Sequence, residues 1–254
     1  MAGVEREEKY HIEGHVFIKK YSGDSVRFFC DGGEVDIVEW NRLLNENQPM
    51  SLLETHPNPL VRIKEEHRRA SIAKLAKPVG GLVVADTGCE RGHLAERLAG
   101  ECGRLFCIDI DAAALDGARA RLKDFQNIDY IVSDIKNIDL PDSSVDVCIA
   151  SEVLEHLPSP GEGIAELVRI TKPGGRIVIS VPNELLVLRL KSIAASVGLG
   201  RSLGRLSSGI AVGHVQVFTK EKLRNLCEGS ITLTSLKYSS PFFLNIFACG
   251  TPVK

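Results

Sequence analysis

From residue 82 onward, short apolar runs alternate with segments of helical periodicity, and this alternation constrains the fold of the 254-residue chain more than any other feature. The strand-like runs lie at 82–85, 104–108, 128–132, 145–150 and 176–181. Continuous apolar runs of this length are typical of strands buried on both faces of a sheet. Because strands joined by helical crossovers run parallel, the pattern predicts a doubly wound α/β sheet.

Two further strand-like segments close the sequence, at 231–237 and 242–249. Only residues 238–241 separate them, and so short a link permits only an antiparallel hairpin. Together with the five earlier strands, they predict a mostly parallel, seven-stranded sheet that ends in an antiparallel C-terminal hairpin.

Residues 1–77 are more irregular and more highly charged. Apolar runs at 16–18, 26–30 and 35–38, separated by turn sequences, predict a small antiparallel meander. Trp40 follows the meander, and we expect it to have a packing role. A cap at Asn58-Pro59 then predicts a charged helix that continues toward residue 77. We therefore expect an N-terminal extension or cap over residues 1–77 and a core domain over residues 78–254.

Charge and cysteine content exclude several functional classes. The chain has 31 basic and 33 acidic residues, for a net charge of −2, so no overall field favours DNA. No apolar run is long enough to cross a bilayer, and the polar N-terminus argues against a signal peptide. Seven cysteines without C-x-x-C spacing are typical of reduced thiols. We therefore expect a cytoplasmic protein.

The loop that follows the first core strand carries the first chemical signal. It reads Asp86-Thr87-Gly88-Cys89-Glu90-Arg91-Gly92, at the strand end where open α/β sheets bind ligands. The loop does not match the dinucleotide-binding motif G-x-G-x-x-G, because Glu90 and His93 stand where the second and third glycines would be. The lysine of a P-loop is also absent. The acidic loop would repel a pyrophosphate. It suits S-adenosylmethionine, which carries a sulfonium, an ammonium and one carboxylate that helix N–H groups can hold.

The order of motifs resembles the class I S-adenosylmethionine-dependent methyltransferases, in the branch that contains ubiquinone and menaquinone biosynthesis enzymes. Asp86-x-Gly88-x-x-x-Gly92 is followed by Asp109 at the end of the second strand and by Asp134 after the third. The resemblance covers roughly residues 78–254 and implies a Rossmann-like fold.

The resemblance also implies roles for individual residues. Asp109 would accept the ribose hydroxyls, Asp134 the adenine amino group, and Ile135 would flank the adenine ring. The cofactor-binding set implied by the family is Asp86, Gly88, Cys89, Gly92, Asp109, Ile110, Asp134, Ile135 and Ser151. One position departs from the family, which usually has glycine where Glu90 stands. If this residue has φ > 0, its side chain costs about 1–2 kcal/mol.

The segment after the fourth strand, Ser151 to Leu157, lines the acceptor site in this family. We consider His156 as a general base for a hydroxyl acceptor, with Glu155 or Glu152 orienting it. In the alternative interpretation, these three residues brace the turn and cap a short helix.

A metal is a second alternative at this place. Glu152, Glu155, His156 and a later histidine, His214, resemble the metal-binding set of small-RNA 3′-terminal 2′-O-methyltransferases, which suggests Mg²⁺ or Mn²⁺. A histidine before a Phe-Thr pair also occurs in metal-free relatives, and the sequence around His214 lacks the extra aspartate and histidine of the RNA enzymes. We therefore expect no metal and keep this set as the minority interpretation.

Residues 183–213 form an insertion in which four basic residues and one acidic residue give a net charge of +3. In this family such an insertion is commonly a lid. A basic, leucine-rich lid suits a lipid-linked acceptor and peripheral membrane contact; the alternative is a helix packed on the core.

We expect an S-adenosylmethionine-dependent methyltransferase that acts on a small or lipid-like acceptor, most readily at oxygen, with no DNA partner. The alternatives are RNA 2′-O-methylation, which we favour less, and a non-catalytic protein that binds the cofactor, which Glu90 suggests. The sequence leaves the oligomeric state open.

Overall fold

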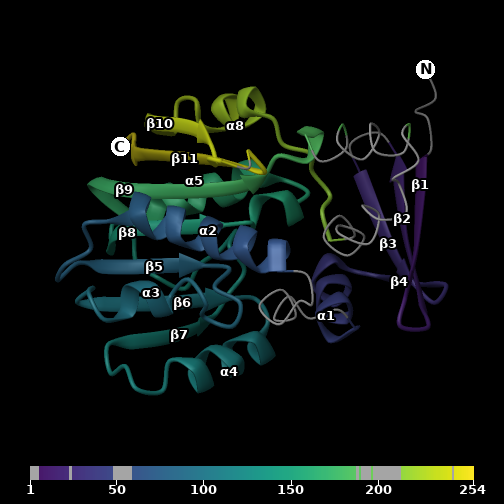
Figure 1. Cartoon of the computed structure of the whole chain (residues 1–254), viewed down its shortest axis with the longest axis horizontal. Coiled ribbons are helices and arrows are strands. Elements are labelled where there is room, and N and C mark those ends of the chain that lie inside the picture. The colour runs from purple at the N-terminus through teal and green to yellow at the C-terminus, as the bar shows by residue number, and fades with distance from the viewer. Residues whose placement is uncertain are drawn as a thin grey trace.

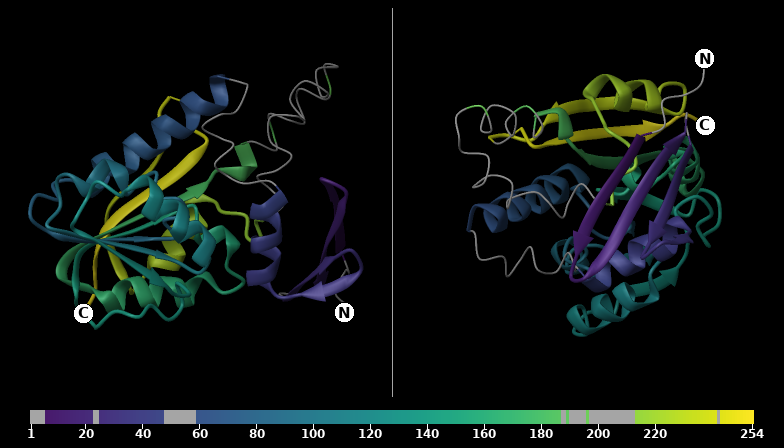
Figure 2. Two further views of the ribbon diagram at one scale, coloured as in Figure 1. Left: turned by 90° about the horizontal axis from the view of Figure 1, so that it is seen from below. Right: turned by 90° about the vertical axis from the view of Figure 1, so that its right-hand side faces the viewer.

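The computed structural model describes residues 6–22, 25–47, 59–186, 189, 196, 213–241 and 243–254. It contains a four-stranded N-terminal sheet and a seven-stranded sheet. Helix α1 (Ile37–Asn47) lies between the two sheets (Figure 1; Figure 2, left). No helix of the described residues has the length and apolar character that crossing a membrane requires.

The N-terminal sheet is antiparallel throughout. Its four strands, in spatial order, are β1 (Arg6–Ile12), β2 (His15–Ser22), β3 (Ser25–Cys30) and β4 (Gly33–Val35). The predicted meander is present. The pattern missed β1 because its sequence is mostly charged, and the last strand of the meander lies at Gly33–Val35 rather than over the predicted 35–38. Asp36 accepts a hydrogen bond from Glu39 N (2.8 Å), which caps a helix and ends the strand.

One hydrophobic cluster joins this sheet to α1. Trp40 is fully buried, and the rings of Phe17 and Phe28 each lie 5.1 Å from it, centroid to centroid. Ile12 and Leu44 complete the buried set. The only tryptophan thus has the packing role that we expected.

The large sheet has the spatial order β10-β11-β9-β8-β5-β6-β7. Its strands are β5 (Val83–Thr87), β6 (Arg104–Asp109), β7 (Ile128–Val132), β8 (Val145–Ser151), β9 (Thr171–Pro182), β10 (Ile231–Tyr238) and β11 (Asn245–Pro252). Strands β5 to β9 pair in parallel, whereas β11 pairs antiparallel with both β9 and β10. The predicted doubly wound sheet with an antiparallel hairpin is confirmed.

Helices cover both faces of this sheet (Figure 2, left). One face packs against α2 (Pro59–Ala76), α3 (Glu96–Ala99) and α4 (Ala112–Arg121), and the other against α5 (Pro160–Ile170) and α8 (Lys220–Cys227). Helix α2 falls within the predicted extension, yet its Ile72, Ala73 and Ala76 belong to the buried cluster of the large sheet. The division of the chain at residue 77 stays a prediction.

The start of one core strand differs from the prediction. Strand β9 begins at Thr171, directly after α5, rather than at residue 176. Residues 187–188, 190–195 and 197–212 lie outside the described residues, so the predicted lid over 183–213 falls mostly outside them.

Candidate functional site

A cavity of about 530 Å³ lies at the carboxyl ends of β5, β6, β7 and β8, where parallel sheets place their ligands. Helices α1 and α2 contribute to its wall through Ile37, Leu44 and Arg68. The predicted residues that line it are Gly88, Asp109, Ile110, Asp134, Ile135, Ser151, Glu152, His156 and His214. The other predicted residues, Asp86, Cys89, Gly92 and Glu155, are buried and are not among the described lining residues.

The loop after β5 requires glycine at two positions. Gly88 and Gly92 have φ values of +71° and +76°, in the left-handed region. A Cβ atom added to Gly88 would lie 2.4 Å from Cγ2 of Val153. The amide N–H groups of Gly88 and Cys89 donate to the carbonyl oxygen of Ile108 (2.8 and 3.0 Å), which fixes the loop against β6.

Glu90, the residue that departs from the family pattern, also has a positive φ, +51°. It therefore carries the strain that the sequence predicted for a non-glycine residue here. Its N–H donates to Oδ2 of Asp109 (2.8 Å), and its side chain lines the cavity. Burial, followed by the nearby Asp109 carboxylate, raises the pKa of Glu90 to about 7.

Asp86 and Asp109 end neighbouring parallel strands. Asp86 is 1% exposed, and its Oδ2 has no hydrogen-bond partner among the described residues. Burial and the Asp109 carboxylate raise the pKa of Asp86 to about 7. Asp109 accepts hydrogen bonds from the N–H groups of Glu90 and Asp111, and it faces the cavity. Of the acidic residues at this edge, Glu90 and Asp109 line the cavity, whereas Asp86 is buried and is not among the described lining residues.

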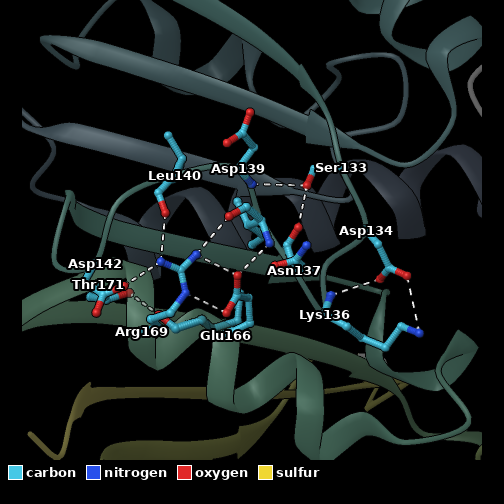
Figure 3. Close-up of polar contacts among 12 residues, drawn as sticks. Ser133, Asp134, Lys136, Asn137, Asp139, Leu140, Asp142, Glu166, Arg169 and Thr171 are labelled. Atoms are coloured by element: carbon cyan, nitrogen blue, oxygen red, sulfur yellow. Dashed lines mark hydrogen bonds and ion pairs between the residues drawn. The ribbon is translucent and has the colours of Figure 1, made fainter.

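Helix α5 holds the loop after β7 in place (Figure 3). Arg169 donates to the carbonyl oxygens of Ile138 and Leu140 (both 2.8 Å), and Glu166 accepts from the N–H of Ile138 (2.6 Å). Asp134 lies on this loop and accepts from the N–H of Lys136 (2.9 Å). The two α5 side chains therefore position Asp134 and its neighbour Ile135 at the cavity.

Arg68 of α2 is a site residue that the sequence reasoning missed. Its Nη1 donates to Oγ of Ser151 (2.7 Å), while Nε and Nη2 donate to one oxygen of Glu65 (3.0 and 2.8 Å). Burial opposes ionisation of Glu65, but Arg68 and Lys64 outweigh it and lower the pKa of Glu65 to about 2. No motif marks Arg68; the only signal was the high charge of the predicted helix.

Glu152 belongs to a network at the end of β8. Its φ is +57°, and its carboxylate accepts from Oγ of Ser180 (2.8 Å) and Nδ2 of Asn245 (3.1 Å). The Oγ atoms of Ser151 and Ser180 lie 3.3 Å apart. This network connects β8 to β9 and β11 and orients Glu152.

His156 and His214 face each other across the cavity wall, with ring centroids 5.0 Å apart. Nδ1 of His156 lies 3.0 Å from the carbonyl oxygen of Gly213. Because a carbonyl oxygen can only accept a hydrogen bond, Nδ1 of the neutral ring carries the proton and Nε2 has the unprotonated lone pair. Burial, with the His214 ring adding to it, lowers the pKa of His156 to about 3. His214 contacts Glu184 through Nδ1.

Glu155 lies beside these two rings. It is fully buried, and neither carboxylate oxygen has a hydrogen-bond partner among the described residues; Nε2 of His214 is 3.9 Å from Oε1. Burial and the Glu152 carboxylate raise the pKa of Glu155 well above its usual value. The ligand atoms of Glu155, His156 and His214 all lie within 4.8 Å of one another, whereas Glu152 is not part of this group of three.

Comparison with known proteins identifies the part of the chain that builds most of this site. Residues 85–179 match the family model described as a methyltransferase domain. Over 116 residues the chain is 37% identical to the malonyl-[acyl-carrier protein] O-methyltransferase of Yersinia pestis. This alignment covers 44% of this chain and 41% of that protein. This part of the chain is a class I S-adenosylmethionine-dependent methyltransferase domain.

Two further comparisons extend this result. The chain is 36% identical over 109 residues to the ubiquinone biosynthesis O-methyltransferase of Thiobacillus denitrificans, and this alignment covers 42% of this chain and 47% of that protein. The chain thus spans less than half the length of these two curated relatives. In fold it is similar to the N-methyltransferase NodS of Bradyrhizobium japonicum, solved with S-adenosyl-L-homocysteine. That similarity has a TM-score of 0.62 at 21% identity and covers 86% of this chain and all of NodS.

Proposed function

We propose that the protein transfers a methyl group from S-adenosylmethionine to an oxygen atom of a small or lipid-like acceptor. The observation that carries this proposal is that Gly88, Asp109 and His156 face one cavity at the carboxyl edge of the large sheet. Two relatives named as O-methyltransferases support oxygen as the methylated atom.

The residues around the cavity fit the cofactor. When bound, S-adenosylmethionine supplies an activated methyl group on a positively charged sulfur. Asp109 and Ile110 would hold the ribose, and Asp134 and Ile135 the adenine. At the other end, the guanidinium of Arg68 offers a cation for the methionine carboxylate.

The acceptor would lie between the cofactor and His156. The Gly213 carbonyl holds the His156 ring with its unprotonated Nε2 available. Alignment of the reacting atoms can contribute about 7–11 kcal/mol, and a positioned base roughly 10²–10⁴-fold. In this proposal His156 accepts the hydroxyl proton as the oxygen is methylated.

The test combines calorimetry with transfer of a radiolabelled methyl group to a panel of hydroxylated small molecules and lipids. We expect wild-type protein to bind S-adenosylhomocysteine, and His156→Gln to keep that affinity while kcat falls about 100-fold. His67→Gln, a substitution on α2 at a position that does not line the cavity, serves as the matched control and should leave both values unchanged. Absence of binding to either form of the cofactor would contradict the proposal.

A second candidate is metal-assisted methylation, and one observation favours it. Glu155 is a fully buried carboxylate without hydrogen-bond partners among the described residues, and two imidazoles lie beside it. Carboxylate and imidazole ligands suit divalent cations. Glu155, His156 and His214 would hold the ion, which would lower the pKa of an acceptor hydroxyl.

Elemental analysis and EDTA treatment distinguish the two candidates. Metal assistance predicts about one equivalent of a divalent ion in purified protein, activity lost with EDTA, and Glu155→Gln protein without metal. Methylation that is insensitive to EDTA in protein free of metal would exclude this candidate and leave His156 as a base.

Glu90 motivates the third candidate, a protein that binds the cofactor without turnover. Its positive φ and its carboxyl group in the cavity both oppose tight binding. If Glu90→Gly raises the affinity for S-adenosylmethionine more than tenfold and the wild type transfers no methyl group, the natural loop is impaired. Wild-type turnover would exclude this candidate.

A further inference from the structure

Lys19, on strand β2, is a fully buried lysine. Its Nζ donates to the backbone carbonyl oxygen of His214 at 2.5 Å, although the two residues are 195 positions apart in the sequence. The Nζ atom also lies 5.7 Å from the centroid of the Tyr10 ring. Because a buried ammonium is costly unless strong partners surround it, this contact between the N-terminal sheet and the site requires an explanation.

Lys19 contacts a segment that organises the acceptor side of the cavity. We call residues 213–216 the strap. Its first carbonyl, that of Gly213, accepts from Nδ1 of His156, and its next residue is His214 itself. The N–H groups of Val215 and Gln216 donate to the carbonyl oxygen of Glu155 (2.8 and 3.0 Å). The strap thus sets the orientation of both histidines.

The alternation of side chains along β2 directs Lys19 toward the strap. Residues i and i+2 of a strand share a face, so Phe17 and Lys19 both point inward. Phe17 belongs to the cluster of Trp40, and Val215 of the strap packs against this same cluster. Lys20 points to the opposite face, where its half-exposed side chain pairs with Glu7 (3.4 Å). The packing of Val215 against the Trp40 cluster and the Lys19 hydrogen bond therefore both attach the strap to the N-terminal sheet.

We propose that Lys19 is a positioning residue that fixes the strap and, through it, the rings of His156 and His214. The N-terminal sheet then acts on the chemistry without touching the cofactor. The inference about activity rests on the proposed function, whereas the inference about geometry does not. A displacement of about 1 Å at a reacting group can cost about 100-fold in rate.

The experiment compares Lys19→Met with Lys20→Met, a matched variant of the adjacent residue on the exposed face. Side-chain ¹⁵N NMR reports the His156 Nδ1–H form, and hydrogen exchange reports the amides of Val215 and Gln216. For Lys19→Met we expect altered His156 signals, exchange of both amides at least tenfold faster, and kcat lower by about 10- to 100-fold. Affinity for S-adenosylhomocysteine should change less than twofold. Lys20→Met should resemble the wild type in every measurement.

Lys19→Gln is the second variant in case Lys19→Met does not fold, and we expect changes in the same direction. Wild-type His156 signals and wild-type exchange in a folded Lys19 variant would overturn the proposal. Failure of the wild type to bind S-adenosylhomocysteine would instead contradict the proposed function. The two failures are therefore distinguishable, because NMR and hydrogen exchange require no activity.

Discussion

At the scale of single residues, Gly88 and Gly174 distinguish two ways in which substitution by alanine can destabilise the fold, backbone strain and steric overlap. Both have positive φ, +71° and +74°, but only an added Cβ at Gly88 meets another atom, Cγ2 of Val153 at 2.4 Å. We expect Gly174→Ala to destabilise the fold by about 1 kcal/mol through backbone strain alone. Gly88→Ala should cost more and lower the affinity for S-adenosylhomocysteine at least tenfold. Urea unfolding and calorimetry measure these effects; equal losses in both variants would contradict a steric role for Val153.

Asp86 makes a second prediction at this scale, on pH dependence. Burial and the Asp109 carboxylate raise its folded-state pKa to about 7, above the unfolded value of 3.8, so the folded protein binds this proton more tightly. The contribution of Asp86 to stability is therefore fully present below about pH 4 and is lost as the pH rises to 7. Asp86→Asn should be more stable than the wild type at pH 8 by on the order of 2–4 kcal/mol, with a smaller difference at pH 4.

Urea unfolding at pH 4, 6 and 8 checks the Asp86 prediction. Asp116→Asn, at an exposed residue of α4 that pairs with Arg119, is the control and should change the unfolding free energy by less than about 0.5 kcal/mol at each pH. If the difference between Asp86→Asn and wild type did not depend on pH, the raised pKa would be wrong.

At the scale of elements, α5 supports the cofactor site through Arg169. This side chain contacts two carbonyl oxygens of the loop after β7 and both Glu166 and Asp142. Arg169→Met leaves these acceptors unpaired, so we expect a loss of about 1–3 kcal/mol and weaker binding of S-adenosylhomocysteine, because Asp134 is on the loop. Arg119→Met removes an exposed pair within α4 and a contact with the face of the Tyr130 ring, so it should leave binding unchanged and cost at most about 1 kcal/mol of stability. Calorimetry and urea unfolding of both variants test this prediction. Unchanged binding in Arg169→Met would show that the loop keeps its conformation without Arg169.

The elements also show how far sequence reasoning reaches. The length and spacing of the apolar runs predicted the large sheet because its inner strands β5, β6 and β8 are buried on both faces and therefore largely apolar. The same reasoning missed β1, whose residues are mainly charged, and α1, whose start depends on one capping side chain, Asp36. It identified Gly88 and Asp109, which adjoin strand ends. It missed Arg68 and Lys19, because each reaches the site through a contact between segments distant in the chain.

At the scale of the whole molecule, the protein has two packing units of unequal size. The N-terminal sheet and α1 enclose one small cluster around Trp40, whereas the large sheet has an extensive cluster on each face. The strap contact of Lys19 and the packing of Val215 join the small unit to the large one. Stability that differs between such units produces sub-global unfolding.

Trp40 is the only tryptophan, so its fluorescence reports the small unit alone, whereas far-UV circular dichroism reports chiefly the helices on the large sheet. We expect the fluorescence transition in urea to precede the dichroism transition. S-adenosylhomocysteine at about 100 times its Kd should stabilise the large unit by about 2.7 kcal/mol and move chiefly the dichroism midpoint. Lys19→Met should widen the separation, because it removes a bond between the units, and Lys20→Met should not. Coincident transitions in the wild type and in both variants would show that the sheets unfold as one cooperative unit.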